Sequence, residues 1–129
     1  MIFYISLIIV RIFKNIRFTL FACREDISDS DLKEAVKQLE VKQATVNLGG
    51  NVYKVRLARP GEGKSGGYRV IVLFKSAEKT FYVYGFAKSD KTNINEKELK
   101  AFKKTAKKYF SMTDEQIKIS IENDELIEI

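Results

Sequence analysis

The sequence predicts an α+β fold in which a small antiparallel β-sheet is packed by N-terminal helices and a C-terminal helix. Three strand-like segments follow one another between Tyr53 and Ala87, and the connections between them are too short for a crossover. Helical periodicity precedes these strands over residues 29–42 and follows them as far as Phe110. A chain of 129 residues is long enough for one domain with one hydrophobic core.

The first ten residues, MIFYISLIIV, are apolar and carry no charged side chain. A membrane span needs about 18–20 such residues, so no membrane association is expected from this segment. Its neighbouring positive charges follow it, whereas those of a secretory signal precede the apolar part. We therefore expect a protein of the cytoplasm.

The composition limits the chemistry that the chain can perform. Cys23 is the single cysteine, which rules out an intrachain disulfide and fits a reducing compartment. We expect its side chain to be a small buried hydrophobic group. There is no histidine, the commonest metal ligand and general acid–base group. A zinc site is therefore not expected, and neither a metal nor another cofactor is predicted.

Two helices are predicted before the strands. The first covers about residues 17–25, where Phe18, Phe21 and Ala22 recur at helical spacing. The second follows Ser28, whose side chain can accept a hydrogen bond from a free amide at a helix start, and runs to about residue 42. Its apolar stripe comprises Leu32, Ala35, Val36 and Leu39.

The first predicted strand alternates between apolar and basic side chains. Successive residues of a strand point to opposite faces of the sheet. Tyr53, Val55 and Leu57 therefore share one face, and Lys54 and Arg56 share the other. This parity predicts a sheet with cations on one side.

Residues 60–67 are predicted to form a loop, because they contain four glycines together with Lys64 and Ser65. Such a loop is either a flexible contact for RNA or a partner, or a plain hairpin connection. The strands that follow, residues 68–74 and 81–87, are apolar on both faces, so we expect them in the centre of the sheet. Arg69 is the one charged residue in the first of them.

The C-terminal part is predicted to be mainly helical. One helix starts at about residues 93–95 and runs to Phe110, a second short helix begins at Thr113, and residues 125–129 alternate like an edge strand. The outer face of the longer helix is basic, which indicates either a solvated surface or a second anion-binding strip. Its lysines are Lys97, Lys100, Lys103, Lys104, Lys107 and Lys108.

Charge is unevenly distributed along the chain, whose formal net charge is +6. The segment 54–108 has a net charge of +10, whereas residues 109–129 have a net charge of −5. A basic region beside an acidic end favours a surface that binds a polyanion, although a solvated lysine-rich surface gives the same numbers.

A set of cations on the predicted sheet suits a phosphodiester and could also support RNA cleavage without a metal. In that reaction the 2′-hydroxyl attacks the adjacent phosphorus, a base accepts its proton, and an acid protonates the leaving 5′-oxygen. A lysine crowded by arginines would have a lowered pKa and could act as the base, while Tyr84 or another lysine could be the acid. The simpler alternative is a binding surface without catalysis. The candidate cations are Lys54, Arg56, Arg69, Lys88 and Lys91.

One long pattern, R-x-A-R-P-G-x-G-K-S-G-G-Y-R followed by Y-G-F-A-K and N-I, resembles the RelE/HigB superfamily of toxins from bacterial type II toxin–antitoxin modules. The resemblance covers about residues 10–129 and its motif stands at Arg56, Ala58–Gly61, Gly63–Arg69, Tyr84–Lys88 and Asn93-Ile94. Relatives usually begin near R-I-F-K-N. We therefore expect a single toxin domain over 10–129 and a non-native extension over residues 1–9, with Val10 encoded by an alternative start codon.

The resemblance implies a RelE-like toxin fold and ribosome-dependent endonucleolytic cleavage of mRNA without a metal. It also implies a cognate antitoxin, commonly a helix-turn-helix protein, through which the complex binds operator DNA. The family's catalytic positions fall on Lys54, Arg56, Arg69 and either Lys88 or Lys91. The C-terminal tyrosine or histidine of several relatives has no clear match. Further candidate RNA contacts lie in the basic loop and helix, namely Arg59, Lys64, Lys100 and Lys104.

Two other functions are compatible with the same resemblance. One is a non-catalytic toxin of the ParE type, which acts on DNA gyrase. The other is a degenerate toxin that only binds its antitoxin and serves as a corepressor.

Overall fold

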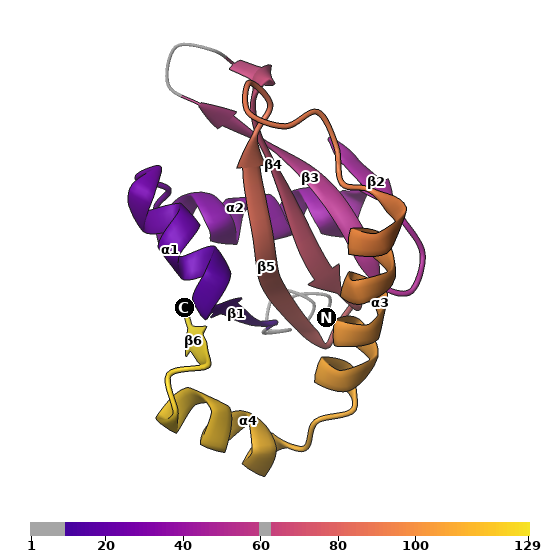
Figure 1. Cartoon of the computed structure of the whole chain (residues 1–129). Coiled ribbons are helices and arrows are strands. Elements are labelled where there is room, and N and C mark those ends of the chain that lie inside the picture. Colours follow the sequence, from indigo (N-terminus) through magenta and orange to yellow (C-terminus); the bar gives the residue numbers. More distant parts are fainter. Residues whose placement is uncertain (1–9, 60–62) are drawn as a thin grey trace, which may run out of the picture.

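The computed structural model describes residues 10–59 and 63–129, including all their side chains except those of 59 and 63–66 (Figure 1). The predicted extension over residues 1–9, the first three residues of the predicted loop (60–62), and the side chains of Arg59 and Lys64 lie outside this description. The elements in chain order are β1 (Arg11–Asn15), α1 (Ile16–Arg24), α2 (Asp29–Val41), β2 (Thr45–Asn47), β3 (Val52–Arg59), β4 (Gly63–Phe74), β5 (Lys79–Ala87), α3 (Glu96–Phe110), α4 (Asp114–Glu122) and β6 (Leu126–Glu128).

The described strands form one six-stranded sheet in the order β2-β3-β4-β5-β1-β6. Its neighbours are antiparallel except for β1 and β5, which run parallel with Phe13 opposite Phe81. The predicted α+β class with a mostly antiparallel sheet is confirmed. The three predicted strands lie in the centre, and the short strands β1 and β2 were not predicted.

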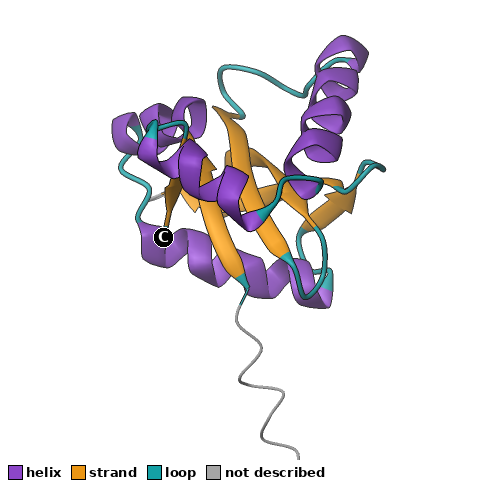
Figure 2. Cartoon of the chain, turned by 90° about the horizontal axis from the view of Figure 1, so that it is seen from below, coloured by secondary structure: helices purple, strands orange, loops and turns teal. Residues whose placement is uncertain are grey.

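Helices cover both faces of the sheet (Figure 2). On one face, α1 and α2 bury their apolar stripes against side chains such as Val55 and Val70. On the other face, α3 and α4 pack against Ile71, Leu73 and Phe81. Burying a large apolar side chain contributes about 1.5–3 kcal/mol, so these two clusters hold the layers together.

The observed helix boundaries lie within about one residue of the predicted boundaries. Ser28 accepts a hydrogen bond from the amide of Asp31 at 3.1 Å and starts α2. The helix ends at Val41 because Lys42 adopts a left-handed conformation, with φ of 60°. Asn95 and Thr113 each form a capping box, in which the third helical residue bonds back to the cap.

Two sequence-based expectations are wrong. The loop predicted over 60–67 is shorter, because β4 already begins at Gly63 and pairs there with Arg59. Glycines give no alternating side-chain pattern, so this part of the strand was not visible in the sequence. Cys23 is exposed instead of buried, because α1 turns Phe18 and Ala22 toward the sheet and leaves Cys23 on its outer side.

In the part of the chain that the structure describes, no helix has the length and apolar character that crossing a membrane would require.

Candidate nucleic-acid interface and active site

The predicted cations of β3 and β4 lie on one face of the sheet. Arg56 pairs directly with Arg69, and Lys54 pairs with Ile71. Because Ile71 belongs to the apolar cluster beneath α3 and α4, its strand parity places Arg69 on that same side. The structure therefore brings these three side chains to the face that lies between α1 and α3 in Figure 1.

The arginine pair is an unfavourable arrangement of two like charges. Arg69 is only 8% exposed, and its Nη1 donates a hydrogen bond to the carbonyl oxygen of Tyr68 at 3.4 Å. Burial, and then the positive charge of Arg56, lower the pKa of the Arg69 guanidinium below its usual value. An anion beside both groups would offset their repulsion, so this position suits a phosphate.

Tyr84 reaches the same face through an irregularity in β5. The pairing with β4 shifts between Ile71, which faces Tyr84, and Val72, which faces Tyr82. Val83 is therefore an extra residue, and both Val83 and Tyr84 pack on the α3 side. Simple alternation would have placed these two neighbours on opposite faces. The ring of Tyr84 lies 5.6 Å from that of Phe102 on α3.

Lys91 is connected to Tyr84 and to a carboxylate that sequence reasoning missed. Its Nζ lies 2.6 Å from Oε2 of Glu98 and 3.4 Å from the hydroxyl oxygen of Tyr84. Glu98 is also the third residue of α3, where its Oε1 accepts a hydrogen bond from the amide of Asn95 at 2.9 Å. The capping pattern N-x-x-E was the available signal for the position of this carboxylate.

For Lys91, the pKa shifts in the opposite direction to the lowering expected of a lysine crowded by arginines. The hydrogen bond with Glu98 is the main reason that the pKa of Lys91 is raised above its usual value. The same bond, with that from the Asn95 amide, lowers the pKa of Glu98. Lys91 therefore stays charged, which argues against the role of a base.

The remaining candidate residues differ in how they relate to this cluster. Lys54 Nζ donates to Oδ1 of Asn93 at 3.3 Å, which links β3 to the segment before α3. Lys88 is exposed after β5 and, among the described side chains, makes no hydrogen bond or ion pair with the other candidates. Lys91 is thus better placed than Lys88. Lys100 and Lys104 are exposed on the outer side of α3, away from the sheet.

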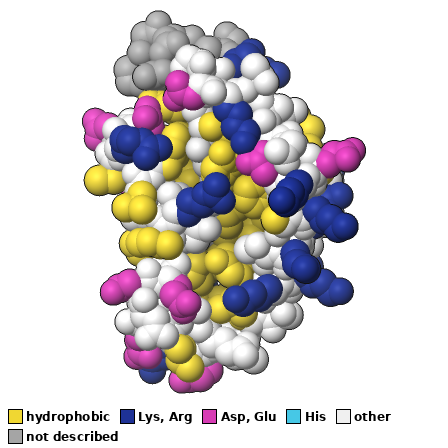
Figure 3. All heavy atoms as spheres, viewed as in Figure 1, with side chains coloured by type: hydrophobic (Ala, Val, Ile, Leu, Met, Phe, Trp, Pro, Cys, Tyr) yellow, Lys and Arg dark blue, Asp and Glu magenta, His cyan; other side chains and the backbone are white. Residues whose placement is uncertain are grey.

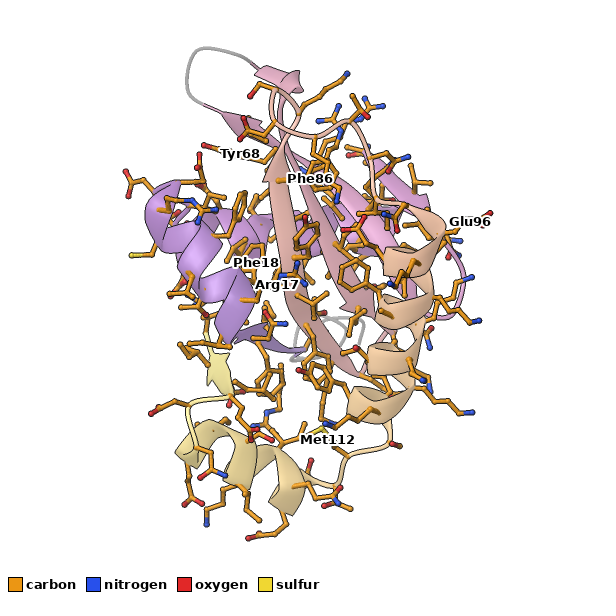
Figure 4. The ribbon with its side chains drawn as sticks, in the orientation of Figure 1. Arg17, Phe18, Tyr68, Phe86, Glu96 and Met112 are labelled. Atoms are coloured by element: carbon orange, nitrogen blue, oxygen red, sulfur yellow. The ribbon has the colours of Figure 1, made fainter. Side chains whose placement is uncertain are left out.

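Arg17 is a further cation at this face that sequence reasoning did not identify. Its Cζ lies 4.4 Å from the centroid of the Tyr84 ring, and its charge contributes to the lowered pKa of Glu98. In Figure 4 Arg17 extends from the start of α1 across β5, on the side of the sheet seen there with Phe86. The helical spacing of α1 gave no signal for this contact, because Tyr84 is distant in the sequence.

The surface around these residues is an apolar strip with Lys and Arg side chains on and beside it (Figure 3). A separate open hollow of about 420 Å³ lies between the β2–β3 turn and α3, and contains none of the candidate residues. Its lining includes Gly50, Lys103, Lys107 and Phe110. Within residues 10–59 and 63–129, no cluster of three or more His, Cys, Asp or Glu side chains could hold a metal ion.

The molecule is a mostly antiparallel α+β domain with a basic sheet face between two helices. The family model described as "RelE toxin of RelE / RelB toxin-antitoxin system" matches residues 10–129. The chain therefore belongs to the RelE family and is a toxin of a toxin–antitoxin system, with a cognate antitoxin as its partner. No curated protein and no solved structure matches the chain.

Proposed function

We propose that this toxin is a ribosome-dependent endoribonuclease that cleaves mRNA in the cytoplasm without a metal. The observation that carries the proposal is the pairing of Arg56 with Arg69 beside the Tyr84–Lys91 contact on one sheet face. Family membership supports it, because cleavage of mRNA on the ribosome is the usual activity of RelE toxins. We also propose that the antitoxin is a helix-turn-helix protein that carries the complex to operator DNA.

The cations have distinct roles in the proposed reaction. Arg56 and Arg69 neutralise the charge that develops on the non-bridging oxygens when the 2′-hydroxyl attacks phosphorus. Each such preorganised donor supplies about 3–4 kcal/mol of transition-state stabilisation. Lys54, held by Asn93, orients the RNA and is the candidate to accept the hydroxyl proton.

Lys91 and Tyr84 form the proton-donating side of the proposed site. The P–O5′ bond breaks as the new O2′–P bond forms, and the 5′-oxygen receives a proton from Lys91 directly or through the Tyr84 hydroxyl. The products are a 2′,3′-cyclic phosphate and a 5′-hydroxyl. Lys91 is protonated at neutral pH as an ordinary lysine is, and its contact with Glu98 holds it beside the Tyr84 hydroxyl.

The proposal is tested by cleavage of mRNA on purified bacterial ribosomes, with Arg69→Ala as the variant. We expect Arg69→Ala to lower the cleavage rate by about 10²–10³-fold and to abolish growth arrest on expression. Arg24→Ala is the matched control, since Arg24 is an exposed arginine of α1 that contacts Phe21 on the other side of the sheet.

Other outcomes would replace the proposal. An Arg69→Ala protein with full activity would show that the roles are wrongly assigned. Growth arrest with intact mRNA and DNA damage would indicate an action on DNA gyrase. A protein that causes neither effect but tightens the binding of its antitoxin to operator DNA would be a corepressor.

A further inference from the structure

We propose that Arg17 is a nucleobase-stacking residue, which extends the interface from the sheet onto α1 and makes it specific for unpaired RNA. The proposal rests on the proposed RNA substrate and adds to it a position that reads the base instead of the phosphate. It is carried by the geometry of Arg17 against Tyr84, by the elements that hold Arg17 there, and by the neighbouring arginine pair.

The guanidinium of Arg17 already lies over an aromatic ring. Its Cζ lies 4.4 Å from the ring centroid of Tyr84, whereas the ring of Phe102 approaches Tyr84 from α3 at 5.6 Å. The tyrosine ring is therefore contacted from both neighbouring helices and is partly buried. Arg17 is exposed, so its flat guanidinium is the planar group near this ring that a ligand can reach (Figure 4).

The backbone fixes the position of Arg17 relative to Tyr84. Helix α1 follows β1 directly, with Asn15 Oδ1 accepting from the amide of Phe18 at 2.8 Å. Because β1 pairs in parallel with β5, the start of α1 is tied to the strand that carries Tyr84. A guanidinium that is ordered before binding loses less conformational freedom when a ligand stacks on it.

The chemistry of the surroundings indicates the ligand. Proteins that recognise single-stranded RNA stack exposed bases on aromatic rings or on arginine planes. In a duplex the bases stack on one another and cannot occupy such a plane. The arginine pair formed by Arg56 and Arg69 lies on the same face and suits the phosphate of the same nucleotide chain. A base on Arg17 and a phosphate at this pair would fix the register of the RNA.

Arg17→Lys separates stacking from charge, because lysine keeps the positive charge and lacks the planar group. The probe is a fluorescent single-stranded RNA with 2′-O-methyl riboses, which cannot be cleaved by 2′-hydroxyl attack. Its affinity is measured by anisotropy over a series of salt concentrations. We expect Arg17→Lys to weaken binding by about 5- to 150-fold, the range of one base–side-chain stack, while the salt dependence stays unchanged.

Matched variants make the result specific. Arg24→Lys alters another exposed arginine of α1, one that lies 5.8 Å from Phe21, and should bind RNA as the wild type does. Arg17→Ala should weaken binding and also reduce the salt slope by about one phosphate contact. Thermal unfolding shows whether each variant is folded. If Arg17→Ala is not folded, Arg17→Lys is sufficient to test the proposal.

The outcomes distinguish this inference from the proposed cleavage. If Arg17→Lys binds the RNA probe with wild-type affinity, the stacking role is overturned. The same holds if the variant weakens only the binding of the antitoxin. An equal loss of affinity for duplex and single-stranded RNA would also overturn it. A wild type that binds the probe but cleaves no mRNA would refute the proposed activity and leave the stacking role standing. A wild type that binds no RNA would overturn the stacking role, whereas the proposed ribosome-dependent cleavage is judged by the assay on ribosomes.

Discussion

At the scale of single residues, the most informative feature is the direct pairing of Arg56 with Arg69. Like charges opposite each other on neighbouring strands destabilise a sheet, and burial of Arg69 adds a desolvation cost. The lowered pKa of Arg69 reflects both effects. A sheet that holds two guanidinium groups in this way favours an anion beside them, because a negatively charged ligand reduces the repulsion between the two groups.

Glu98 provides a residue-scale prediction about the proton donor. Replacing Glu98 with Gln removes the carboxylate that is the main cause of the raised pKa of Lys91. We expect the pKa of Lys91 to fall toward the ordinary lysine value of about 10.4. Its charge at neutral pH is kept, so the change appears only in the alkaline range. NMR titration of the lysine side-chain nitrogens measures this directly.

Glu96→Gln is the matched control, since Glu96 lies in the same first turn of α3 and is exposed. It should leave the pKa of Lys91 as in the wild type. An unchanged Lys91 titration in Glu98→Gln would mean that the ion pair at 2.6 Å does not persist in solution.

At the scale of elements, the site depends on the close approach of α1 to β5. A Cβ atom added at Gly85 would lie 2.4 Å from Cε2 of Phe21, well inside van der Waals contact. Phe21 is itself packed against Phe18 and Tyr68, with ring centroids 5.9 and 5.7 Å away, so it has little room to move. The absence of a side chain at Gly85 therefore sets the distance between the helix and the strand.

Gly85→Ala should lower the free energy of unfolding by about 1–3 kcal/mol, because the added methyl group overpacks this contact. Urea denaturation measures the loss. Phe21→Leu makes space at the same point, so the double variant should lose less than the sum of the two single changes. Strictly additive losses would show that the cost at Gly85 comes from the backbone and not from Phe21.

The elements also show which parts of the fold a sequence can reveal. Ser28 and Thr113 predicted helix starts correctly, and the start predicted at about residues 93–95 agrees with the cap at Asn95. Capping is a local interaction between residues close in the sequence. The strand Arg11–Asn15 was missed, since its partners are β5 and β6 and its five residues carry no period of their own. Strand Thr45–Asn47 is shorter still.

The same distinction applies to the site. Parity within a strand was enough to place Lys54 and Arg56 together, and the register then added Arg69. Tyr84 reaches the site through an extra residue in β5, and Arg17 through the packing of α1 beside that strand. Such contacts depend on tertiary structure, so no local pattern could have indicated them.

At the scale of the whole molecule, carboxylates of the acidic C-terminal segment form ion pairs with cations of the sheet. Arg11 Nε and Nη2 donate to the two carboxylate oxygens of Glu128 at 2.8 and 2.9 Å. Asp114 lies 3.9 Å from both Arg11 and Lys79. The C-terminal carboxylates of Asp114 and Glu128 thus pair with cations of β1 and β5, and not with Lys54 or Arg56 on the basic face.

This arrangement predicts how stability depends on pH. The hydrogen bond with Arg11 lowers the pKa of Glu128 below its unfolded value of about 4.3. The folded state therefore binds this proton less readily than the unfolded state. The resulting stability is fully present above the unfolded pKa and is lost as pH falls through the lower folded pKa. Glu128→Gln should remove this part of the acid destabilisation.

Thermal unfolding between neutral pH and about pH 2.5 measures the effect, with Glu122→Gln as a control on an exposed carboxylate of α4. At neutral pH, Glu128→Gln should cost at most about 1 kcal/mol, because the pair is partly exposed, and high salt should reduce that cost. At the acid end the variant and the wild type should converge, since the wild-type carboxylate is then protonated. A constant difference over the whole pH range would mean that Glu128 stabilises the sheet by packing, and that the link between β1 and β6 is not electrostatic.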